Sequence, residues 1–559
     1  MMRIGARQWF ASGLPWIWLN GAAVAINVIM VVGLLGLIAV RGLGHFWPAA
    51  ILQAEVRVQQ EMTTLIGSIA DDELVSADQL RATGVDLAEG QESAKRLLIK
   101  AGNRDVTGAD FLWVLEQDLK QLSYPKEVMT LERREWGNFY GRLVAVKQAG
   151  AVISDRDTQE DAVLWALLLE RVARSLSIYD DIKRIEKGTI GDINYGMERL
   201  RLDQRGLELE GLLTPILQAE LDAKRDVLDR RYEGLQQQLI DLYAAFERDS
   251  MMAETMSGAQ VEINVSKIVR AFRPNDMTGM EKITFYMSKV WEFVSTEPRE
   301  ANTEGGVYPA IFGTVLMVLL MSVMVTPIGV VAAIYLREYA KQGFVTRIIR
   351  IAVNNLAGVP SIVYGVFGLG FFIYFLGGNI DQLFFADAAP APTFGTPGLL
   401  WASLTLALLT VPVVIVATEE GLSRIPRAVR EGSLALGATK SETLWRVVLP
   451  MSSPAIMTGV ILAVARAAGE VAPLMLVGVV KLAPSLPLDG NYPFLHLDQK
   501  FMHLGFHIYD VGFQSPNVEA ARPLVYATAF LLVLVIALLN LSAVAIRNRL
   551  REKYKALES

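Results

Sequence analysis

The sequence predicts an all-α membrane protein, with six transmembrane helices plus a large, mainly helical extracytoplasmic domain. Two observations predict it. Apolar stretches of about 20 residues or more, each long enough to cross a bilayer, occur once near the start and five times after residue 305. Between them lies a segment rich in charged residues, in which leucines recur at heptad spacing.

Composition excludes several other classes. Hydrophobic residues make up 52% of the 559 residues, which excludes a disordered chain. No cysteine is present, so a disulfide scaffold, a cysteine-ligated metal site and a cysteine nucleophile are excluded. A net charge of −6 argues against nucleic acid as a partner. Only four histidines are available, and we predict no metal site.

The first apolar stretch, from Trp16 to Val40, carries no charge. We interpret it as an uncleaved anchor, because it is longer than the apolar core of a signal peptide and no clear cleavage site follows. The other predicted spans are Tyr308–Leu336, Ile351–Leu376, Leu399–Thr418, Met451–Val480 and Pro523–Ile546.

Basic residues give the orientation of these spans. Four lie between the second and third spans, from Arg337 to Arg350, and five between the fourth and fifth, from Arg424 to Arg446. The loop between the third and fourth spans has none. Because basic loops stay in the cytoplasm, both termini are predicted there, in a multi-pass protein of the plasma (inner) membrane.

This orientation divides the chain into three regions. Residues 1–47 form a cytoplasmic tail and the first anchor, residues 48–305 an extracytoplasmic domain, and residues 306–559 a five-helix membrane domain with a cytoplasmic loop at 419–450.

The extracytoplasmic segment is predicted to contain one long helix and few strands. Leu221, Leu228, Leu235 and Leu242 recur every seven residues among polar side chains, which favours a helix in a hairpin or bundle. VEINVSKIV and ITFYMSKVWEFV, between residues 261 and 294, alternate and predict a small strand pair. The stretches around Pro125 and from Gly188 to Gly191 predict turns.

The most informative motif is EGSLALGATKSETLWRVVLP, from Glu431 to Pro450. Gly432 and Gly437 have the spacing of P-loop glycines, but Ala438 stands where the lysine should be and no strand precedes it. We therefore predict no nucleotide site. The preceding RAVREGSLAL is a short amphipathic helix, and Gly437 ends it. Ala438 begins a second helix that enters the membrane at Pro450, so the loop forms a compact cytoplasmic knob.

The spacing of this motif resembles the EAA loop of ABC importer permeases. The resemblance is carried by Glu431, Gly432, Ser433, Gly437, Val447, Leu449 and Pro450. Gly432 and Ser433 replace the two alanines that are usual in that family. The resemblance implies that the loop, including Ala438, docks on a separate ATPase subunit.

Three further segments are similar to the PstA-type permeases of phosphate importers. They are GVPSIVYGVFGLGFF from Gly358, VATEEGLSRIPRAVREGSLALGAT from Val416, and ILAVARAAGEVAPLML from Ile461. The family usually has Thr where this chain has Val471. The resemblance covers residues 308–546 and assigns no activity to the outer domain.

Arg466 and Glu470 are charged residues inside the fifth span. Intramembrane charges normally face a bundle interior or a wet pathway, and a four-residue spacing places both on one helix face. An arginine can bind two oxygens of a phosphate. We predict that Arg466 contacts the anion and that Glu470 holds Arg466 when no substrate is present. The alternative is a structural ion pair.

The resemblance implies a permease subunit, not an enzyme, that moves inorganic phosphate. It binds no cofactor itself, and ATP and magnesium belong to a partner ATPase dimer. The other implied partners are a second permease subunit, an extracytoplasmic phosphate-binding protein and the lipid bilayer, with no nucleic acid. Alternatives are the sister permease, a permease for another oxyanion, and, in a different class, a membrane-anchored sensor.

Overall fold

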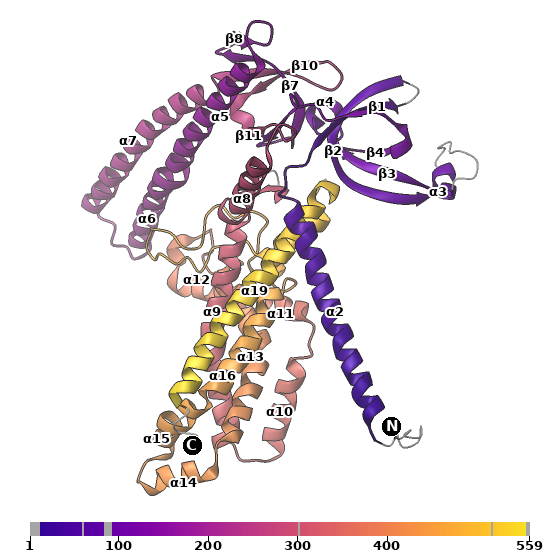
Figure 1. The fold of residues 1–559 in the computed structure, drawn as a ribbon. Coiled ribbons are helices and arrows are strands. Elements are labelled where there is room, and N and C mark those ends of the chain that lie inside the picture. The colour runs from indigo at the N-terminus through magenta and orange to yellow at the C-terminus, as the bar shows by residue number, and fades with distance from the viewer. Residues whose placement is uncertain are drawn as a thin grey trace.

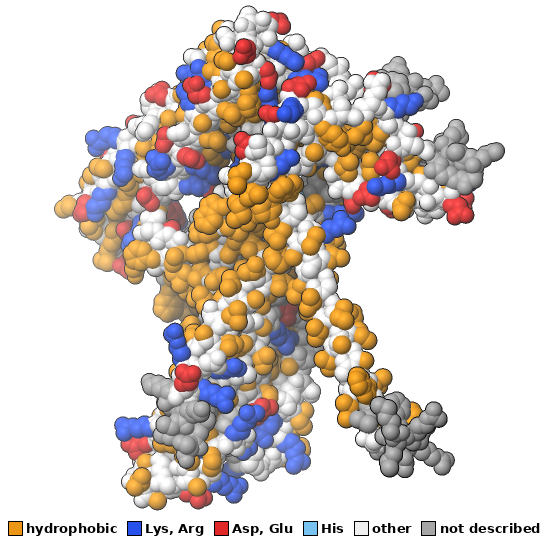
Figure 2. All heavy atoms as spheres, in the orientation of Figure 1, with side chains coloured by type: hydrophobic (Ala, Val, Ile, Leu, Met, Phe, Trp, Pro, Cys, Tyr) orange, Lys and Arg blue, Asp and Glu red, His pale blue; other side chains and the backbone are white. Residues whose placement is uncertain are grey.

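The computed structural model describes residues 10, 12–58, 61–82, 92–299, 302–515 and 518–554. It consists of a bundle of long helices with an α/β part at one end (Figure 1). Hydrophobic side chains cover the middle of the bundle, and Lys, Arg, Asp and Glu side chains gather at its two ends (Figure 2). This distribution suits a membrane-spanning body.

Six helices among the described residues are long and apolar enough to cross a membrane, as predicted. They are Pro15–Gly44, Tyr308–Tyr339, Ser361–Phe384, Leu399–Arg424, Lys440–Gly469 and Ala521–Glu552. The central helix is α13 (Leu399–Arg424), which packs between α9 (Tyr308–Ile334) and α16 (Leu449–Gly469). Its buried face meets residues of both neighbours in one apolar core.

The bounds of two predicted spans are wrong. The third span begins at Ser361, not Ile351, because residues 344–356 form a separate amphipathic helix, α10 (Phe344–Leu356). Pro360 lies between the two and favours an extended backbone. The fifth span ends at Gly469, not Val480, and is followed by a short helix, α17 (Leu474–Val477).

The prediction of a mainly helical, all-α outer domain is also wrong, because this part contains two large antiparallel sheets besides the short pair of β12 (Pro298–Arg299) and β13 (Glu304–Gly305). The first has the strand order β4-β3-β2-β1-β5. Its strands are β1 (Ile51–Val58), β2 (Glu61–Ser76), β3 (Ser93–Lys100), β4 (Phe111–Leu115) and β5 (Leu119–Ser123). In β1 the buried Leu52, Ala54 and Val56 alternate with polar residues, which is the period of a half-buried strand.

The second sheet has the strand order β10-β9-β7-β6-β11, with β8 paired to β7. The strands are β6 (Met129–Arg133), β7 (Phe139–Gln148), β8 (Ala151–Asp155), β9 (Asp249–Glu254), β10 (Gln260–Asn264) and β11 (Ile268–Phe272). Leu164, Leu168 and Val172 of α5 (Asp161–Lys183) are buried against the core of this sheet. The sheet is therefore half-covered by a helix, as in α+β domains.

A helical arm is inserted between β8 and β9 (Figure 1). It comprises α5, a π-helical stretch at Arg184–Thr189, α6 (Ile190–Leu209) and α7 (Pro215–Phe246). The long helix predicted from the heptad leucines is confirmed as α7, which pairs with α6 across a turn at Gly211, whose φ is 70°. The turn predicted at Gly188–Gly191 is wrong, because the chain there stays helical.

The predicted strand pair is half right. Residues 260–264 and 268–272 are strands, but β10 pairs with β9 and β11 pairs with β6. Residues 283–294 belong to a helix, α8 (Gly279–Ser295), which begins at a capping box formed by Thr278 and Glu281. The turn at residues 126–127, beside Pro125, is confirmed.

The first spanning helix, α2 (Leu14–Gly44), diverges from the bundle (Figure 1). It meets α19 (Val518–Tyr554) near its outer end, where a Cβ on Gly42 would lie 2.7 Å from the backbone of Ala527. No residue of its most apolar 18-residue window is buried within the chain.

Candidate functional site: the pathway face and the cytoplasmic knob

Arg466 and Glu470 lie at the point where α16 breaks. Arg466 is in the last helical turn, and Glu470 is the first residue beyond it, with extended backbone angles (φ −81°, ψ 132°). The expectation that both residues share one helix face is therefore wrong. They still approach each other, with 3.6 Å between Arg466 Nε and Glu470 Oε1, and their side chains are 31% and 22% exposed.

Below Arg466 the same face of α16 borders a cavity. Thr458 and Leu462 stand two turns and one turn before Arg466 and line a space of about 380 Å³. The remaining lining residues come from α10 and α13: Asn354, Ala357, Pro412, Val413, Val416, Ala417 and Glu420. Arg466 therefore lies above a mostly apolar recess built by three helices.

The two glutamates at the end of α13 have different surroundings. Glu419 pairs with Arg350 of α10 at 3.3 Å, so it joins α13 to α10. Glu420 lines the cavity. The sequence alone could not separate their roles, because they are adjacent.

The loop from Glu431 to Pro450 forms two helices joined at a tight turn. The first is α14 (Arg427–Ala435), and the second begins with α15 (Lys440–Thr443) and continues through a π-helical stretch into α16. Gly437 has a φ of 88°, a conformation that glycine adopts without strain. The second helix begins at Lys440, not Ala438, because Thr439 and Glu442 form a capping box.

Polar contacts hold this knob against the ends of the bundle. Ser433 and Thr443 hydroxyls lie 2.9 Å apart across the two helices. Arg430 pairs with Glu338 at 3.1 Å and donates to the backbone carbonyl of Leu422 at 2.6 Å. Beneath these contacts Leu422, Ile425, Leu444 and Val448 form a buried cluster. The knob is therefore fixed to the end of α13 and the start of α16.

Comparisons with known proteins identify this arrangement. Residues 325–554 match the family model described as "Binding-protein-dependent transport system inner membrane component". A phosphate transport system permease protein PstA 1 of Mycobacterium tuberculosis is 37% identical over 247 residues, which are 44% of this chain and 71% of the relative. The chain belongs to the PstA family of permeases.

Other relatives match the same half of the chain. A probable ABC transporter permease protein, YqgH, of Bacillus subtilis is 30% identical over 42% of this chain and 71% of its own length. A phosphate transport system permease protein PstC of Xylella fastidiosa is 30% identical over 36% of this chain and 64% of its own length. As a PstA-family permease, the protein is a transporter subunit and not an enzyme.

In this permease the predicted motif residues divide into exposed and structural groups. Glu431, Gly432 and Gly437 are exposed, whereas Ser433, Ala438, Leu449 and Pro450 are half-buried. Sequence reasoning missed Leu436, which is 91% exposed beside Gly437. The sequence signal that could have identified Leu436 is an apolar residue next to the glycine of a turn. Leu436, with the exposed Leu434 and Trp445, gives the knob an apolar tip.

The histidines of the last outer loop do not converge. His496 contacts Asp489 at 2.8 Å. His503 is buried, with its Nδ1 accepting a hydrogen bond from the backbone of Gly505, and burial lowers its pKa to about 4. Within the described ranges, no group of three or more His, Asp or Glu side chains is arranged to hold a metal ion.

The helical arm contacts the rest of the chain at two places near the spanning helices. Lys183 and Lys187 contact Glu297, which precedes α9, at 3.1 and 2.5 Å. Further along, Tyr195 of α6 donates to the backbone carbonyl of Tyr492 in the last outer loop. The arm is thus joined to the start of one span and to a loop that follows another.

Proposed function

We propose that this PstA-family chain is one permease subunit of an ATP-driven importer of inorganic phosphate. The observation that carries the proposal is the course of α16. This helix starts at the cytoplasmic knob, at Leu449 and Pro450, and ends at the Arg466–Glu470 pair. A movement imposed on the knob is therefore transmitted along a helix to a charged site above a cavity.

The partners follow from this arrangement. An ATPase dimer, with ATP and magnesium on that partner and no cofactor on this chain, docks on the knob through Glu431, Gly432 and the exposed Leu436. A second permease subunit completes the pathway. The divergence of α2 from the bundle supports this heterodimer, because the most apolar part of α2 is not buried by any other described part of the chain.

Phosphate is the substrate that the relatives favour, since several carry phosphate transport in their names. Arg466 supports an oxyanion, because its guanidinium matches two oxygens of one anion. A phosphate-binding protein delivers the substrate from outside. The nearest alternatives are the role of the sister permease, supported by the PstC relative, and another oxyanion.

The location proposed is the plasma membrane, with both termini and the 419–450 loop in the cytoplasm and residues 48–305 outside. The asymmetry of Lys and Arg among the loops supports this orientation. A membrane-anchored sensor is the rival from another class, which the large outer domain suggests. The knob favours transport, because a sensor has no use for an ATPase docking surface.

The test is transport by the reconstituted complex. Vesicles containing this chain, the second permease and the ATPase, supplied with the phosphate-binding protein, are expected to take up labelled phosphate only with ATP. Excess sulfate or molybdate should not compete. Uptake of another oxyanion in place of phosphate would reassign the substrate, and assembly without any ATP-dependent uptake would favour the sensor.

A further inference from the structure

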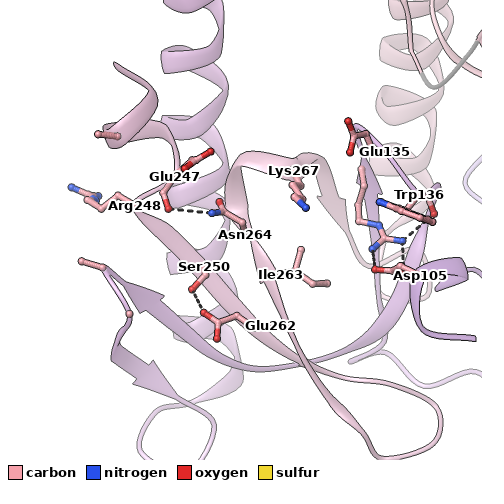
Figure 3. A pocket seen from close by; sticks show the side chains of 14 residues that line it. Asp105, Glu135, Trp136, Glu247, Arg248, Ser250, Glu262, Ile263, Asn264 and Lys267 are labelled. Atoms are coloured by element: carbon pink, nitrogen blue, oxygen red, sulfur yellow. Dashed lines mark hydrogen bonds and ion pairs between the residues drawn. The ribbon is translucent and has the colours of Figure 1, made fainter. Parts of the chain in front are cut away.

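The outer domain carries a cleft of about 580 Å³ at the end of its second sheet (Figure 3). The loop between β6 and β7, the end of α7, strands β9 and β10 and the residues after β10 build its walls. It is lined by Asp105, Arg133, Glu135, Trp136, Ala149, Gly150, Ala244, Glu247, Arg248, Ser250, Glu262, Ile263, Asn264 and Lys267. Its size is that of a small-molecule site.

One wall presents a strained tryptophan. Trp136 is 46% exposed and has a φ of 71°, which is a genuine outlier for a bulky side chain. The buried Arg133 holds this conformation, because it donates to the carbonyls of Trp136 and Gly137 at 3.0 Å each. Asp105 binds the same guanidinium through two hydrogen bonds of 2.7 and 3.0 Å.

The strained backbone of Trp136 raises the free energy of the folded chain. A strained residue persists only when its surroundings over-determine it, and such residues concentrate at functional sites. Here the buried Arg133, paired with the exposed Asp105, fixes the backbone of Trp136 at the rim of a cleft, where the ring remains partly open to solvent. The result is a preformed flat apolar surface.

The rest of the cleft lining, including Glu135 beside Trp136, offers charged side-chain groups that make no hydrogen bond to another described residue. Arg248 is paired with Asp249, and Glu262 with Lys147. In contrast, the side chains of Lys267, Glu135 and Glu247 have no hydrogen bond or ion pair among the described residues. Figure 3 shows Lys267 between Glu247 on one side and Glu135 on the other.

The charges and the hydrogen-bonding capacity of these groups indicate which ligands the cleft can bind. Glu135 and Glu247 on either side of Lys267, together with Asp105, which interacts electrostatically with Lys267, disfavour an anion such as the proposed phosphate cargo. A hydroxyl group both donates and accepts, so it can bind Glu135 and Glu247 as well as Lys267. The guanidinium of Arg104 lies over the Trp136 ring, 5.5 Å from its centroid, and a ligand ring with an apolar face suits the part of the indole that stays exposed.

We propose that this cleft is a binding site for a neutral saccharide, with a sugar ring stacked on Trp136 and its hydroxyls bonded to Lys267, Glu135 and Glu247. The site is independent of the transport pathway. It depends on the proposed function only for its position outside the membrane. The saccharide is either a free oligosaccharide or part of a cell-wall glycan, which share this chemistry.

The test is isothermal titration of the full chain in nanodiscs with maltotriose and with triacetylchitotriose. Saturable binding of either is expected, and tighter binding of the acetylated sugar assigns the site to cell-wall glycans. Trp136→Gly should weaken binding at least tenfold while the Tm stays the same or rises, because glycine accepts the positive φ. Lys267→Met should also weaken binding.

Trp291→Ala is the matched control, since Trp291 is an exposed tryptophan on α8 outside the cleft. Its binding should equal that of the unmodified protein. The proposal is overturned if neither sugar binds, if Trp136→Gly binds as well as the unmodified chain, or if phosphate or glycylglycine binds in place of the sugars with the same dependence on Trp136.

Discussion

The Arg466–Glu470 ion pair is loose. Its closest atoms are 3.6 Å apart, both side chains are partly exposed, and the Arg466 guanidinium makes no hydrogen bond to another described residue. Ion pairs of this kind contribute little to stability. The donors of the guanidinium are therefore available to an anion, as the pathway hypothesis requires.

The decisive variant at this scale is Arg466→Ala. We expect it to abolish phosphate uptake, and Arg466→Lys to restore it only in part, because an ammonium cannot bind two oxygens in one plane. The double variant Arg466→Ala/Glu470→Ala removes the carboxylate left unpaired by the single change. It should assemble and hydrolyse ATP without importing phosphate. Normal vesicle uptake by the double variant would show that the pair is structural.

The sequence spacing identified Arg466 and Glu470 as a pair but did not predict how the two side chains are arranged. The four-residue interval predicts a shared helix face, whereas α16 ends at Gly469 and Glu470 adopts an extended conformation. Gly469 and Pro473 flank the break, and a glycine followed by a proline is the usual signal for the end of a helix. That signal was hidden within an apolar run that continues to Val480.

Among the elements, helices with one polar face were predictable, whereas of the strands only β10 and β11 were. The heptad leucines identified α7 because the rest of its surface is solvated. In α8, Tyr286, Val290 and Phe293 contact an apolar cluster, while Met280, Ile283, Met287 and Trp291 are exposed. Apolar residues on both faces imitate the alternation of a strand. In β1 the alternation is real, but it extends over only eight residues.

The knob depends on the turn between its helices, which gives a second prediction. Gly437 has a φ of 88° and open space around it, so a side chain there meets no clash but a strained backbone. Gly437→Ala should cost about 1–2 kcal/mol locally and tilt the two helices. We expect normal membrane insertion with a several-fold loss of phosphate-dependent ATPase coupling, measured in the reconstituted complex.

Gly432→Ala is the comparison for this turn, because alanine keeps a small side chain at this docking position and disturbs no positive φ. Gly432 lies in α14, does not have a positive φ and has no atom near its missing Cβ. Alanine favours a helix by about 1 kcal/mol over glycine, so the knob should be kept or stabilised. Equal coupling in the Gly437→Ala and unmodified complexes would argue that the knob turn does not transmit the ATPase movement.

At the scale of the whole molecule, the outer domain and the knob are predicted to lie on opposite sides of the membrane. The chain has no cysteine, so single cysteines can be introduced without background labelling. With an impermeant reagent, Gln236→Cys in α7 should be labelled from outside and Trp445→Cys, which lies on the knob, only from the cytoplasm. Cytoplasmic labelling of residue 236 would reverse the proposed topology.

A cluster of charges joins α8, which precedes the spanning helix α9, to the second sheet of the outer domain, and it makes this junction sensitive to acid. Lys289 of α8 contacts Glu132 of β6 at 2.9 Å and Glu292 at 3.3 Å, and Arg270 of β11 contacts Glu292 at 2.9 Å. Burial opposes ionisation of Glu132 and Glu292, but the neighbouring positive charges outweigh it. The pKa of each carboxyl is therefore held below its usual value of 4.5.

The sign of the pH dependence follows from this lowered pKa. A carboxyl whose pKa is lower in the folded state contributes stability above its unfolded value, and that contribution is lost as the pH falls through the folded value. We expect the Tm of the outer domain to be steady between pH 7 and about 5 and to fall below about 4.5. Glu132→Gln should lower the Tm at pH 7 and reduce the acid dependence. Glu135→Gln is the control, because it removes a carboxylate without an ionic partner in the described chain; it should change neither the Tm at pH 7 nor its acid dependence. An unchanged acid transition in Glu132→Gln would show that the junction is held by its apolar contacts alone.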